Sequence, residues 1–390
     1  MPLIYALNNL LSDLLSDNSF IERYELVKFM KRTMADYISE TPEVVKKNIK
    51  NAEILTKTLV KEFLAKPHKR ILIVGSGSSY NGALCARDFM RKVLAVDVKV
   101  IPPASFLFFE HDLKEDDFVF VVSQTGYSTN ALLALELLKS KGLRTIGVTG
   151  DSESDFKAVS DVVVDYGVGI ETVHYVTQGV TTLVAFLVAF ACETAKALGK
   201  MTVAEVASCY QDVNQIMDQH PQIIADTNQW FEKNIKDLSS LQTLFLCSYG
   251  SNYGTIYEGA LKISETVHIP AFPLEAEEFI HGPFLQVNPN YSLLFLDTGA
   301  EGSERLRDIF TASKMMTDHT FLVTDQAMPG DDKVLQVMET PNQLLNPLIY
   351  LPVVQTLAFR ASTYPERYQH PLLEGFKKAI LSKSPNYKED

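Results

Sequence analysis

Two stretches of the sequence decide the fold: "LIVGSGSSYNGALCARDF" at residues 72–89 and "LFLCSYGSNYGTIYEGAL" at residues 244–261. Each begins with an apolar run typical of a buried strand, continues through a turn rich in glycine and serine, and ends in a segment with helical spacing. We interpret them as corresponding parts of a duplicated strand–turn–helix unit.

Similar elements follow each copy. Further short β-branched runs are "FVFVVSQTG" (118–126), "RTIGVTGD" (144–151), "DVVVDYG" (161–167), "YSLLFLDTGA" (291–300) and "HTFLVTD" (319–325). Helical segments are expected at residues 81–93, 130–141 and 202–238. Alternating strands and helices predict an α/β fold with two tandem units, each a doubly wound, mainly parallel sheet flanked by helices.

The chain of 390 residues is too long for one ordinary core. We predict a helical N-terminal segment (1–65), a first α/β domain (66–205), a second (206–365) and a C-terminal tail (366–390). The tail has no core of its own, so we expect it either to dock on the rest of the protein or to stay mobile.

The net charge of −12 argues against a nucleic-acid or membrane partner, because there is no basic surplus to neutralise phosphates. An anionic substrate would have to be held by local donors instead. The N-terminus lacks a signal-peptide pattern, and the longest apolar stretch, residues 180–192, is too short to span a bilayer and is interpreted as a buried helix. We expect a cytoplasmic protein.

The four cysteines are far apart in the sequence and form no C-x-x-C pair, which favours reduced thiols over disulfides or a zinc site. The eight histidines contain no H-x-H or H-x-x-x-H pair. We therefore expect neither a metal nor another cofactor.

Two turns of the first half are rich in hydrogen-bond donors. Such turns lie at the carboxyl ends of the strands, where doubly wound sheets bind ligands, and hydroxyls with backbone N–H groups suit a phosphate. A single turn of this kind would more simply be a helix N-cap, but two on neighbouring strands favour an anion site. The candidate phosphate-binding residues are Ser78, Ser79, Ser123, Gln124, Thr125 and Ser128.

The second half has lost most of these donors, because "VVSQTGYST" is replaced by "LFLDTGAEG" at the corresponding strand end. We therefore predict one binding site per chain, in the first half. A nucleotide-binding interpretation fits less well: "GSGSSYNG" misses the G-x-G-x-x-G spacing, and no acidic residue closes the next strand-like run.

Glu258, Lys262 and Glu265 share one face of the helix that begins near residue 253, and His281 follows in the loop "FIHGP". The simpler interpretation is an exposed face with i,i+4 ion pairs, and an isolated histidine is usually structural. However, the helix starts at a turn equivalent to the binding turn of the first half, which would bring its first turns to the mouth of a sheet.

The motifs "GSSYN", "VSQTGYST", "GIETVHYVTQGVTT", "EGALKISE" and "EFIHGP" occur in this order. Together they resemble the sugar isomerase (SIS) family, in particular the double-SIS isomerase part of glucosamine-6-phosphate synthases and the fructosamine-6-phosphate deglycases. The resemblance covers roughly residue 34 to the end of the second α/β unit.

The resemblance implies that the serine, threonine and glutamine candidates named above hold a sugar phosphate. It also implies that Glu265 moves a proton between C1 and C2, with Lys262 as a further catalytic residue in the same site. His281 would assist ring opening, commonly from the neighbouring subunit, so that a homodimer or higher homo-oligomer is expected. Burial would raise the pKa of such a glutamate, and a nearby lysine would oppose that rise.

The sequence also departs from the family pattern. It begins Met-Pro instead of placing a cysteine after the initiator, so we do not expect glutamine-dependent amidotransfer. The lysine of the family's "STK" motif is replaced by Gln178, and Lys383 in "LSKSPNY" is the nearest match to the C-terminal lysine motif.

The sequence thus predicts a phosphosugar enzyme, either a ketose/aldose isomerase or a deglycase of a 6-phosphorylated amino sugar. The alternative is a non-catalytic phosphosugar sensor. It is less favoured, because the N-terminal segment shows no basic recognition helix and Glu265 and His281 are both retained.

Overall fold

A computed structural model describes residues 32–388, except for residues 174, 298, 300, 301, 341 and 365–369. The helix expected in residues 1–31 therefore lies outside the described residues. The next part of that segment is helical as expected, because it forms α3 (Met34–Lys50) and α4 (Ala52–Leu64).

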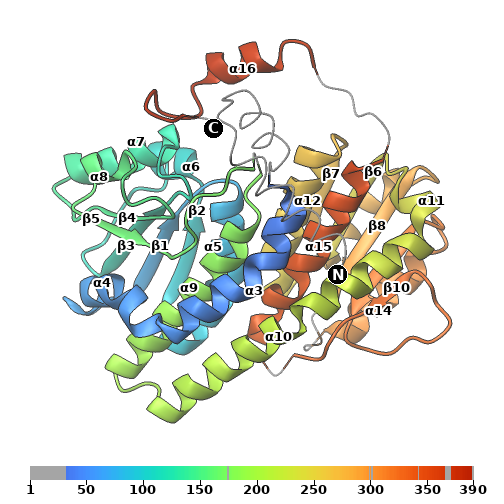
Figure 1. Cartoon of the computed structure of the whole chain (residues 1–390), viewed down its shortest axis with the longest axis horizontal. Coiled ribbons are helices and arrows are strands. Elements are labelled where there is room, and N and C mark those ends of the chain that lie inside the picture. The colour runs from blue at the N-terminus through green and yellow to red at the C-terminus, as the bar shows by residue number, and fades with distance from the viewer. Residues whose placement is uncertain are drawn as a thin grey trace, which may run out of the picture. The chain divides into compact units, whose positions relative to one another are not determined.

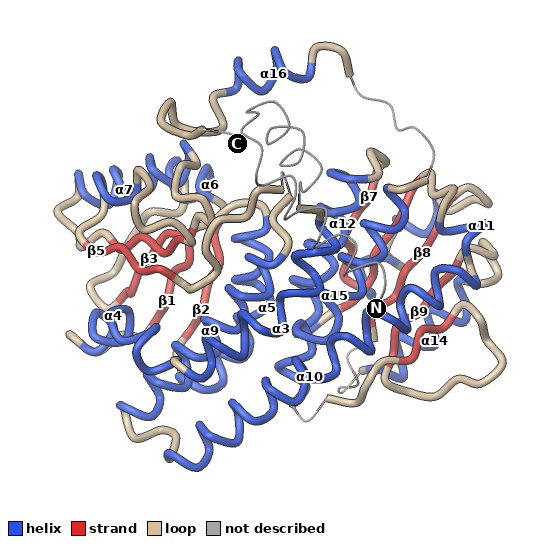
Figure 2. The backbone as a smooth tube through the Cα atoms, in the orientation of Figure 1, coloured by secondary structure: helices blue, strands red, loops and turns tan. Residues whose placement is uncertain are grey.

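Two five-stranded parallel sheets form the framework of the protein (Figures 1 and 2). The first has the order β2-β1-β3-β4-β5 and the second the order β10-β9-β8-β6-β7. Numbered within each half, both orders are 2-1-3-4-5, so the predicted duplication is confirmed. The strands are β1 (Arg70–Val74), β2 (Asp97–Ile101), β3 (Asp117–Val122), β4 (Ile146–Thr149), β5 (Val162–Asp165), β6 (Thr243–Ser248), β7 (Ala271–Glu275), β8 (Tyr291–Leu296), β9 (Thr320–Thr324) and β10 (Val334–Gln336).

The helices cover both faces of each sheet, as the doubly wound fold requires. The longer ones are α5 (Ser78–Leu94), α7 (Thr129–Ser140), α9 (Gln178–Ala197), α10 (Val203–Lys233), α12 (Tyr253–Thr266), α14 (Ser303–Ser313), α15 (Asn346–Ser362) and α16 (Leu373–Ile380). The shorter ones are α6 (Pro103–Phe108), α8 (Phe156–Val159), α11 (Ile235–Leu238) and α13 (Ala276–Phe279), with 3₁₀ turns at Gly250–Asn252, Pro283–Gln286 and Gln343–Leu345.

Strand register brings the donor-rich turns to one edge of the first sheet. Val74 at the end of β1 is paired with Val121 near the end of β3, so the turns after these two strands lie next to each other. On its other side, Val74 is paired with Ile101, at the end of β2. The expectation that ligand-binding turns gather at the carboxyl ends of the strands therefore agrees with the register.

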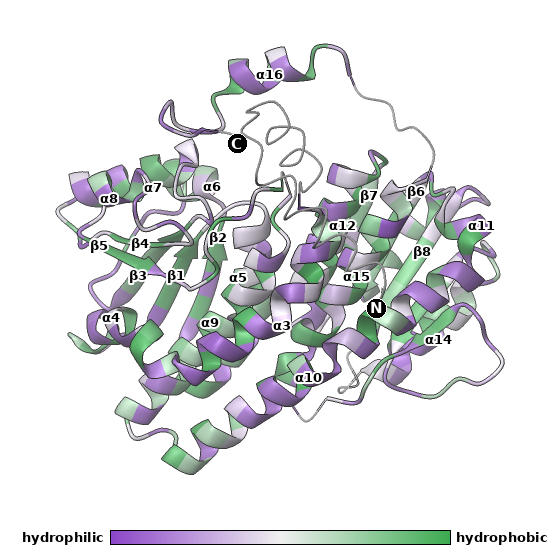
Figure 3. Ribbon diagram, in the orientation of Figure 1, coloured by the Kyte–Doolittle hydropathy of each residue, from purple (hydrophilic) through white to green (hydrophobic). Residues whose placement is uncertain are grey.

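The main core runs through both halves. Alternate residues of β1 point to opposite faces: Ile71 and Ile73 join the main cluster, whereas Leu72 and Val74 pack with α6 and α7. The main cluster also contains Leu246 and Leu294 of the second sheet. In Figure 3, β3 and β4 are largely green, whereas the long surface helix α10 alternates between purple and green along its length.

Helix α9 is a core helix. It has 20 residues and is therefore longer than the predicted stretch of residues 180–192. By length and composition alone, both α9 and the helical stretch Gln343–Ser362 are able to cross a membrane. However, 89% of the most apolar window of α9 is buried inside the protein, and 83% of that of Gln343–Ser362. The interpretation of this stretch as a buried helix is confirmed.

Helices α5 and α12 join the two halves. A Cβ atom placed on Gly254 of α12 would lie 2.5 Å from the backbone nitrogen of Cys85 and 2.7 Å from the carbonyl oxygen of Asn81, both on α5. Glycine at this position therefore permits a backbone-to-backbone approach that no side chain would allow. This close crossing fixes α12 against α5, a helix of the first half.

The four cysteines are all buried and free. Although distant in sequence, Cys192 of α9 and Cys209 of α10 lie with their Sγ atoms 3.6 Å apart. This neighbourhood was not visible in the sequence, because it depends on how the two helices pack.

Candidate active site

The predicted stripe of charges on α12 exists, but it is buried rather than exposed. Lys262 is 0% exposed, its Nζ lies 3.5 Å from Oε1 of Glu258, and it forms a closer ion pair with Oε2 of Glu265. The simpler interpretation of an exposed helix face is therefore wrong for Glu258 and Lys262. One ammonium group neutralises two carboxylates inside the protein.

Glu258 also holds α5 in place. Its Oε1 accepts a hydrogen bond of 2.9 Å from Ser78 Oγ, and its Oε2 accepts one of 2.9 Å from Asn81 Nδ2. The hydroxyl of Ser78, a candidate phosphate ligand, is thus directed at Glu258. Ser79 is buried in the same helical turn, and neither serine lines the large cavity described below. Their role in phosphate binding stays a prediction.

The turn between β3 and α7 gathers the other hydroxyl candidates. Ser123 Oγ donates to Ser128 Oγ over 3.1 Å and accepts a hydrogen bond from the backbone N–H of Gly126. Gly126 has a φ of +70°, and a Cβ atom there would lie 1.9 Å from Ser154 Oγ. The tight turn requires glycine, and it presents Gln124 and Thr125 to the cavity.

Lys383 lies directly on this turn. Its Nζ donates hydrogen bonds to Thr125 Oγ1 at 2.8 Å and to Ser128 Oγ at 3.2 Å. The backbone supports the contact, because Ser128 and Lys383 form an antiparallel β-bridge. The described part of the C-terminal tail therefore docks on the first half of the chain. Lys383, the nearest match to the family's C-terminal lysine motif, reaches the candidate phosphate site.

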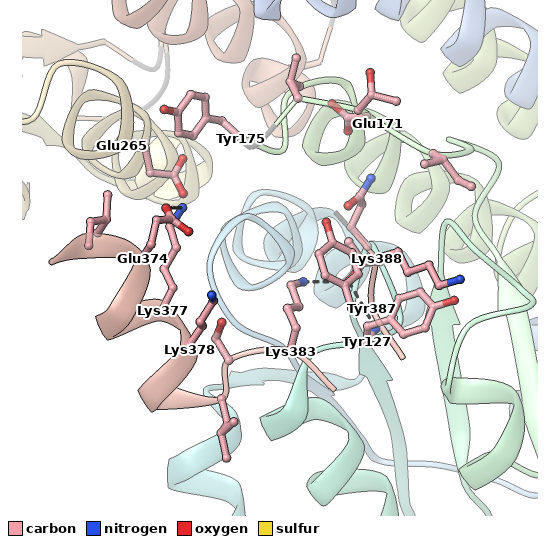
Figure 4. Close-up of a pocket in the computed structure, with 18 of the residues that line it drawn as sticks. Tyr127, Glu171, Tyr175, Glu265, Glu374, Lys377, Lys378, Lys383, Tyr387 and Lys388 are labelled. Carbon is pink, nitrogen blue, oxygen red and sulfur yellow. Dashed lines mark hydrogen bonds and ion pairs between the residues drawn. The ribbon is translucent and has the colours of Figure 1, made fainter. Parts of the chain in front are cut away.

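A cavity of about 1350 Å³ joins these elements. Its wall comes from the loops after β3, β4 and β5, from the last turn of α12, and from the C-terminal segment that contains α16 (Figure 4). Thr125, Lys383 and Glu265 all line it. Glu265 reaches it from the end of α12 rather than from the first turns that the sequence suggested, and it faces the loops of the first sheet.

The protonation of Glu265 is set by two opposing effects. Burial raises the pKa of its carboxyl, and the positive charge and hydrogen bond of Lys262 oppose that rise without cancelling it. For Lys262, burial alone would lower the pKa of the ammonium group, but Glu258 and Glu265 together outweigh burial and raise it. Lys262 stays charged, and Glu265 becomes a stronger base than an ordinary glutamate.

Sequence reasoning missed Glu171. Its carboxylate accepts three backbone N–H groups at the start of α9, from Thr177 (2.9 Å), Gln178 (3.1 Å) and Gly179 (2.6 Å). Burial raises its pKa, while these three hydrogen bonds and Lys262 oppose the rise. An acidic residue shortly before a predicted helix was the available signal.

The backbone N–H groups at the start of a helix commonly bind an anion, and here the carboxylate of Glu171 is that anion. The N–H groups at the start of α9 are therefore already used, and the same carboxylate lines the cavity. Gln178, which replaces the family lysine, is buried at the first position of this helix.

His281 lies elsewhere. It is exposed, its backbone N–H donates to the carbonyl oxygen of Glu278, and it does not line the cavity within this chain. The structure thus brings together Glu265, Lys383 and the β3–α7 turn, but it leaves His281 apart from them.

Among the residues that the structure describes, no group of three or more histidine, cysteine, aspartate or glutamate side chains is arranged to hold a metal ion.

The comparison with known proteins finds a family model that matches the first half of the chain. Residues 63–192 match the SIS domain family model, so the chain carries a SIS domain in its first half. The matched residues contain the first of the two described sheets, and the second sheet has the same strand order.

Two curated relatives illustrate the similarity in sequence. The glutamine–fructose-6-phosphate aminotransferase (isomerizing) of Pyrococcus horikoshii is 25% identical over 334 residues, which is 84% of this chain and 54% of that protein. The human enzyme 2 of the same name is 27% identical over 235 residues, which is 58% of this chain and 33% of that protein. The chain spans about half the length of the first relative, or less for the second.

Solved structures extend the similarity of fold to nearly the whole chain. A protein of Clostridium difficile 630 with a provisional phosphosugar isomerase name has a TM-score of 0.82 at 24% identity, and the match covers 91% of this chain and 100% of that one. The C-terminal domain of glucosamine-fructose-6-phosphate aminotransferase from Francisella tularensis gives 0.76 at 20% identity, with 85% and 96% covered. Tagatose-6-phosphate ketose/aldose isomerase of Escherichia coli gives 0.69 at 13% identity, with 87% and 96% covered.

Proposed function

We propose that the protein is a phosphosugar enzyme that opens a cyclic 6-phosphorylated sugar or amino sugar and moves a proton between C1 and C2. The reaction is either a ketose/aldose isomerisation or the removal of an amine from a fructosamine 6-phosphate. The observation that carries the proposal is a single cavity lined by a hydroxyl-rich turn, a lysine and a buried glutamate.

The phosphate end of the cavity is assigned to the β3–α7 turn. Thr125 and Ser128 already bind a cation, the ammonium group of Lys383, through their hydroxyl oxygens. A phosphate group would take the lysine as counter-ion and the hydroxyls as donors, since each hydroxyl both donates and accepts. This arrangement supplies a local positive charge in a protein whose net charge is −12.

Glu265 is assigned the proton transfer. In the isomerase reaction its carboxylate removes the proton from C1 of a ketose, an enediol forms, and the same proton returns to C2. A carboxylate whose pKa is raised by burial is a better base for a carbon-bound proton. Lys262 is a positioning residue, because it pairs with Glu265 but does not itself line the cavity.

Ring opening is assigned to His281 of a second copy of the chain. Its exposure, and its absence from the cavity lining within one chain, are compatible with a histidine supplied across an interface. The names of the related proteins support the same chemistry, because they include isomerizing aminotransferases and a ketose/aldose isomerase.

Hydrogen exchange tests the proposal. The protein is incubated in D₂O with fructose 6-phosphate, glucosamine 6-phosphate and fructosamine 6-phosphates, and deuterium at C1 and C2 is followed by NMR. We expect incorporation by the wild type and a loss of at least about 100-fold in Glu265→Gln, which keeps the shape but removes the base.

The phosphate assignment has its own control. Ser123→Ala combined with Thr125→Ala should weaken phosphosugar binding by about tenfold or more while exchange persists at saturating substrate. Tight binding of phosphosugars without any exchange would instead support a sensor, and unchanged affinity in the double variant would move the anion site elsewhere.

A further inference from the structure

Two cysteines that the proposed reaction does not use are in contact where α9 packs against α10. Sγ of Cys192 on α9 lies 3.6 Å from Sγ of Cys209 on α10, and the S–H group of Cys192 is the donor. Cys85, by comparison, has a hydroxyl for a neighbour, because its Sγ lies 3.8 Å from Thr255 Oγ1. Of the four cysteines, this pair alone brings two thiols together.

A polar contact holds the two helices at the level of the thiols. The residues that directly follow the cysteines in the sequence, Glu193 and Tyr210, are hydrogen-bonded to each other, with Tyr210 Oη donating to Glu193 Oε1 over 2.7 Å. Glu193 also forms an ion pair with Lys196, one turn further along α9. The relative position of the two helices is therefore fixed by more than apolar packing.

The two thiols are not equivalent. Cys192 is completely buried, whereas 6% of Cys209 is exposed. The hydrogen bond to Cys209 and burial both raise the pKa of Cys192, so this thiol keeps its proton. The same hydrogen bond is donated to the sulfur of Cys209 and would stabilise negative charge there. Cys209 is thus the thiol that an oxidant meets first.

The pair also lies close to a groove on the protein surface. Glu193 and Lys196 line a groove of about 520 Å³ between α4 and α9. A solvent-lined surface therefore begins one residue away from Cys192. A small, uncharged oxidant has a short path from this surface to the sulfurs.

We propose that Cys192 and Cys209 form a modification site, at which a hydroperoxide oxidises the two thiols to a disulfide that joins α9 to α10. This inference goes beyond the proposed phosphosugar reaction and does not depend on it. The cross-link would close a short loop, residues 192–209, and would stabilise the fold mainly by restricting the unfolded chain.

The oxidation balances with one hydroperoxide, and hydrogen peroxide serves as the example. Cys209 loses its proton to solvent and its sulfur attacks a peroxide oxygen, which gives a sulfenic acid and a hydroxide ion that takes up a proton to become water. The sulfur of Cys192 then attacks the sulfur of the sulfenic acid, the S–S bond forms, and the hydroxyl group leaves with the proton of Cys192 as a second water. The peroxide is reduced to two waters while the two thiols are oxidised to one disulfide.

Thiol counting tests the site. The full-length reduced protein is exposed to hydrogen peroxide, unfolded, alkylated with N-ethylmaleimide and mapped by peptide mass spectrometry. We expect the number of alkylated cysteines to fall from four to two, with a reducible link between the peptides of Cys192 and Cys209. Cys85→Ser, which removes a buried thiol that has no thiol neighbour, is the matched control and should form the same link.

Single variants test the two roles. In Cys192→Ser the sulfenic acid has no second thiol to react with, so dimedone should label Cys209 after peroxide treatment. In Cys209→Ser, dimedone should leave Cys192 unlabelled. For the wild type, the urea midpoint of unfolding should be higher after oxidation by at least about 0.5 M, and dithiothreitol should abolish the increase.

Four alkylated cysteines after peroxide treatment would overturn the inference, and so would a link that involves Cys85 or Cys247. Labelling of Cys192 in the Cys209→Ser variant would reverse the assigned roles and contradict the proposed order of oxidation. An oxidised protein with an unchanged or lower urea midpoint would contradict the stabilising cross-link. Because all four readouts concern thiols and stability, none of them depends on whether the protein turns over a phosphosugar.

Discussion

At the scale of single residues, the site is governed by one buried lysine between two glutamates. Lys262 is completely buried, and burial of an ion without partners would cost several kcal/mol. Glu258 and Glu265 both offset this cost, but their surroundings differ. Glu258 is enclosed by Ser78 and Asn81, whereas Glu265 opens into the cavity. The same lysine therefore serves both a structural carboxylate and the proposed base.

This arrangement predicts the pH dependence of exchange. Glu265 must be ionised to act as a base, and its pKa lies above the ordinary value of 4.5. We expect the exchange rate to rise with pH along an acid limb centred above 4.5. The limb should be measured as kcat against pH with saturating fructose 6-phosphate, and residual exchange in Glu265→Gln should lack it. A limb centred at or below the ordinary value would contradict the assignment.

The same pKa shift has a consequence for stability. A carboxyl whose pKa is higher in the folded than in the unfolded state stabilises the fold at low pH, and this contribution is lost as the pH rises through the folded-state pKa. Relative to Glu265→Gln, the wild-type free energy of unfolding should therefore fall over the same pH range in which exchange appears.

At the scale of elements, the crossing of α5 and α12 determines where the proposed base lies. Gly254 lets the two backbones approach each other closely. The hydrogen bonds that Glu258 accepts from Ser78 and Asn81 fix the rotation of each helix about its axis. Because Glu265 follows Glu258 by two helical turns, this crossing carries it to the loops of the first sheet. An error in the crossing would displace the base from the cavity.

Gly254→Ala tests this crossing. The added methyl group would lie 2.5 Å from a backbone nitrogen, which cannot move as a flexible side chain would. We expect the free energy of unfolding in urea to fall by about 1–3 kcal/mol or more, as for other overpacked sites, with a loss of exchange activity.

Gly375→Ala provides the matched control. This glycine lies in α16 with no atom within 4 Å of an added Cβ, so the substitution should leave stability unchanged or raise it slightly. If both alanine variants behaved alike, the close approach of α5 and α12 would not be the cause.

At the scale of the whole molecule, the two halves share a topology but divide the proposed work. The first sheet supplies the hydroxyl-rich turn, the second half supplies Glu265 through α12, and the C-terminal segment supplies Lys383. His281 completes the set only if another copy of the chain brings it to the cavity. The proposed site is thus assembled from segments that are far apart in the sequence.

Complementation tests the proposed sharing of His281. Glu265→Gln and His281→Ala are each expected to lose most activity alone. When the two are unfolded together and refolded as a 1:1 mixture, half of the dimers should be mixed, and each should contain one intact site. The mixture should therefore regain about a quarter of wild-type activity. No recovery, or a fully active monomer by light scattering, would place the ring-opening group within one chain.

The sequence predicted the strands and helices that carry the fold, because their patterns are local. The strands from β1 to β5 were visible as β-branched runs, apart from small shifts at their ends, and α10 with its flanking turn was visible as a long helical stretch. The short strands β7 and β10 were not predicted. Both lie at the edges of the second sheet. β7 contains Pro273, which weakens a strand prediction, and β10 has only three residues.

What the sequence by itself determined is the duplicated α/β fold and the kinds of groups available for chemistry, since apolar spacing and residue types act over a few neighbouring positions. Only the tertiary structure decided that Glu258 and Lys262 are buried, that Ser78 is directed at Glu258, that Glu171 occupies the start of α9, and that Lys383 reaches the β3–α7 turn. Each of these depends on contacts between segments that no local pattern relates, because helix crossings and the path of the C-terminal segment bring them together.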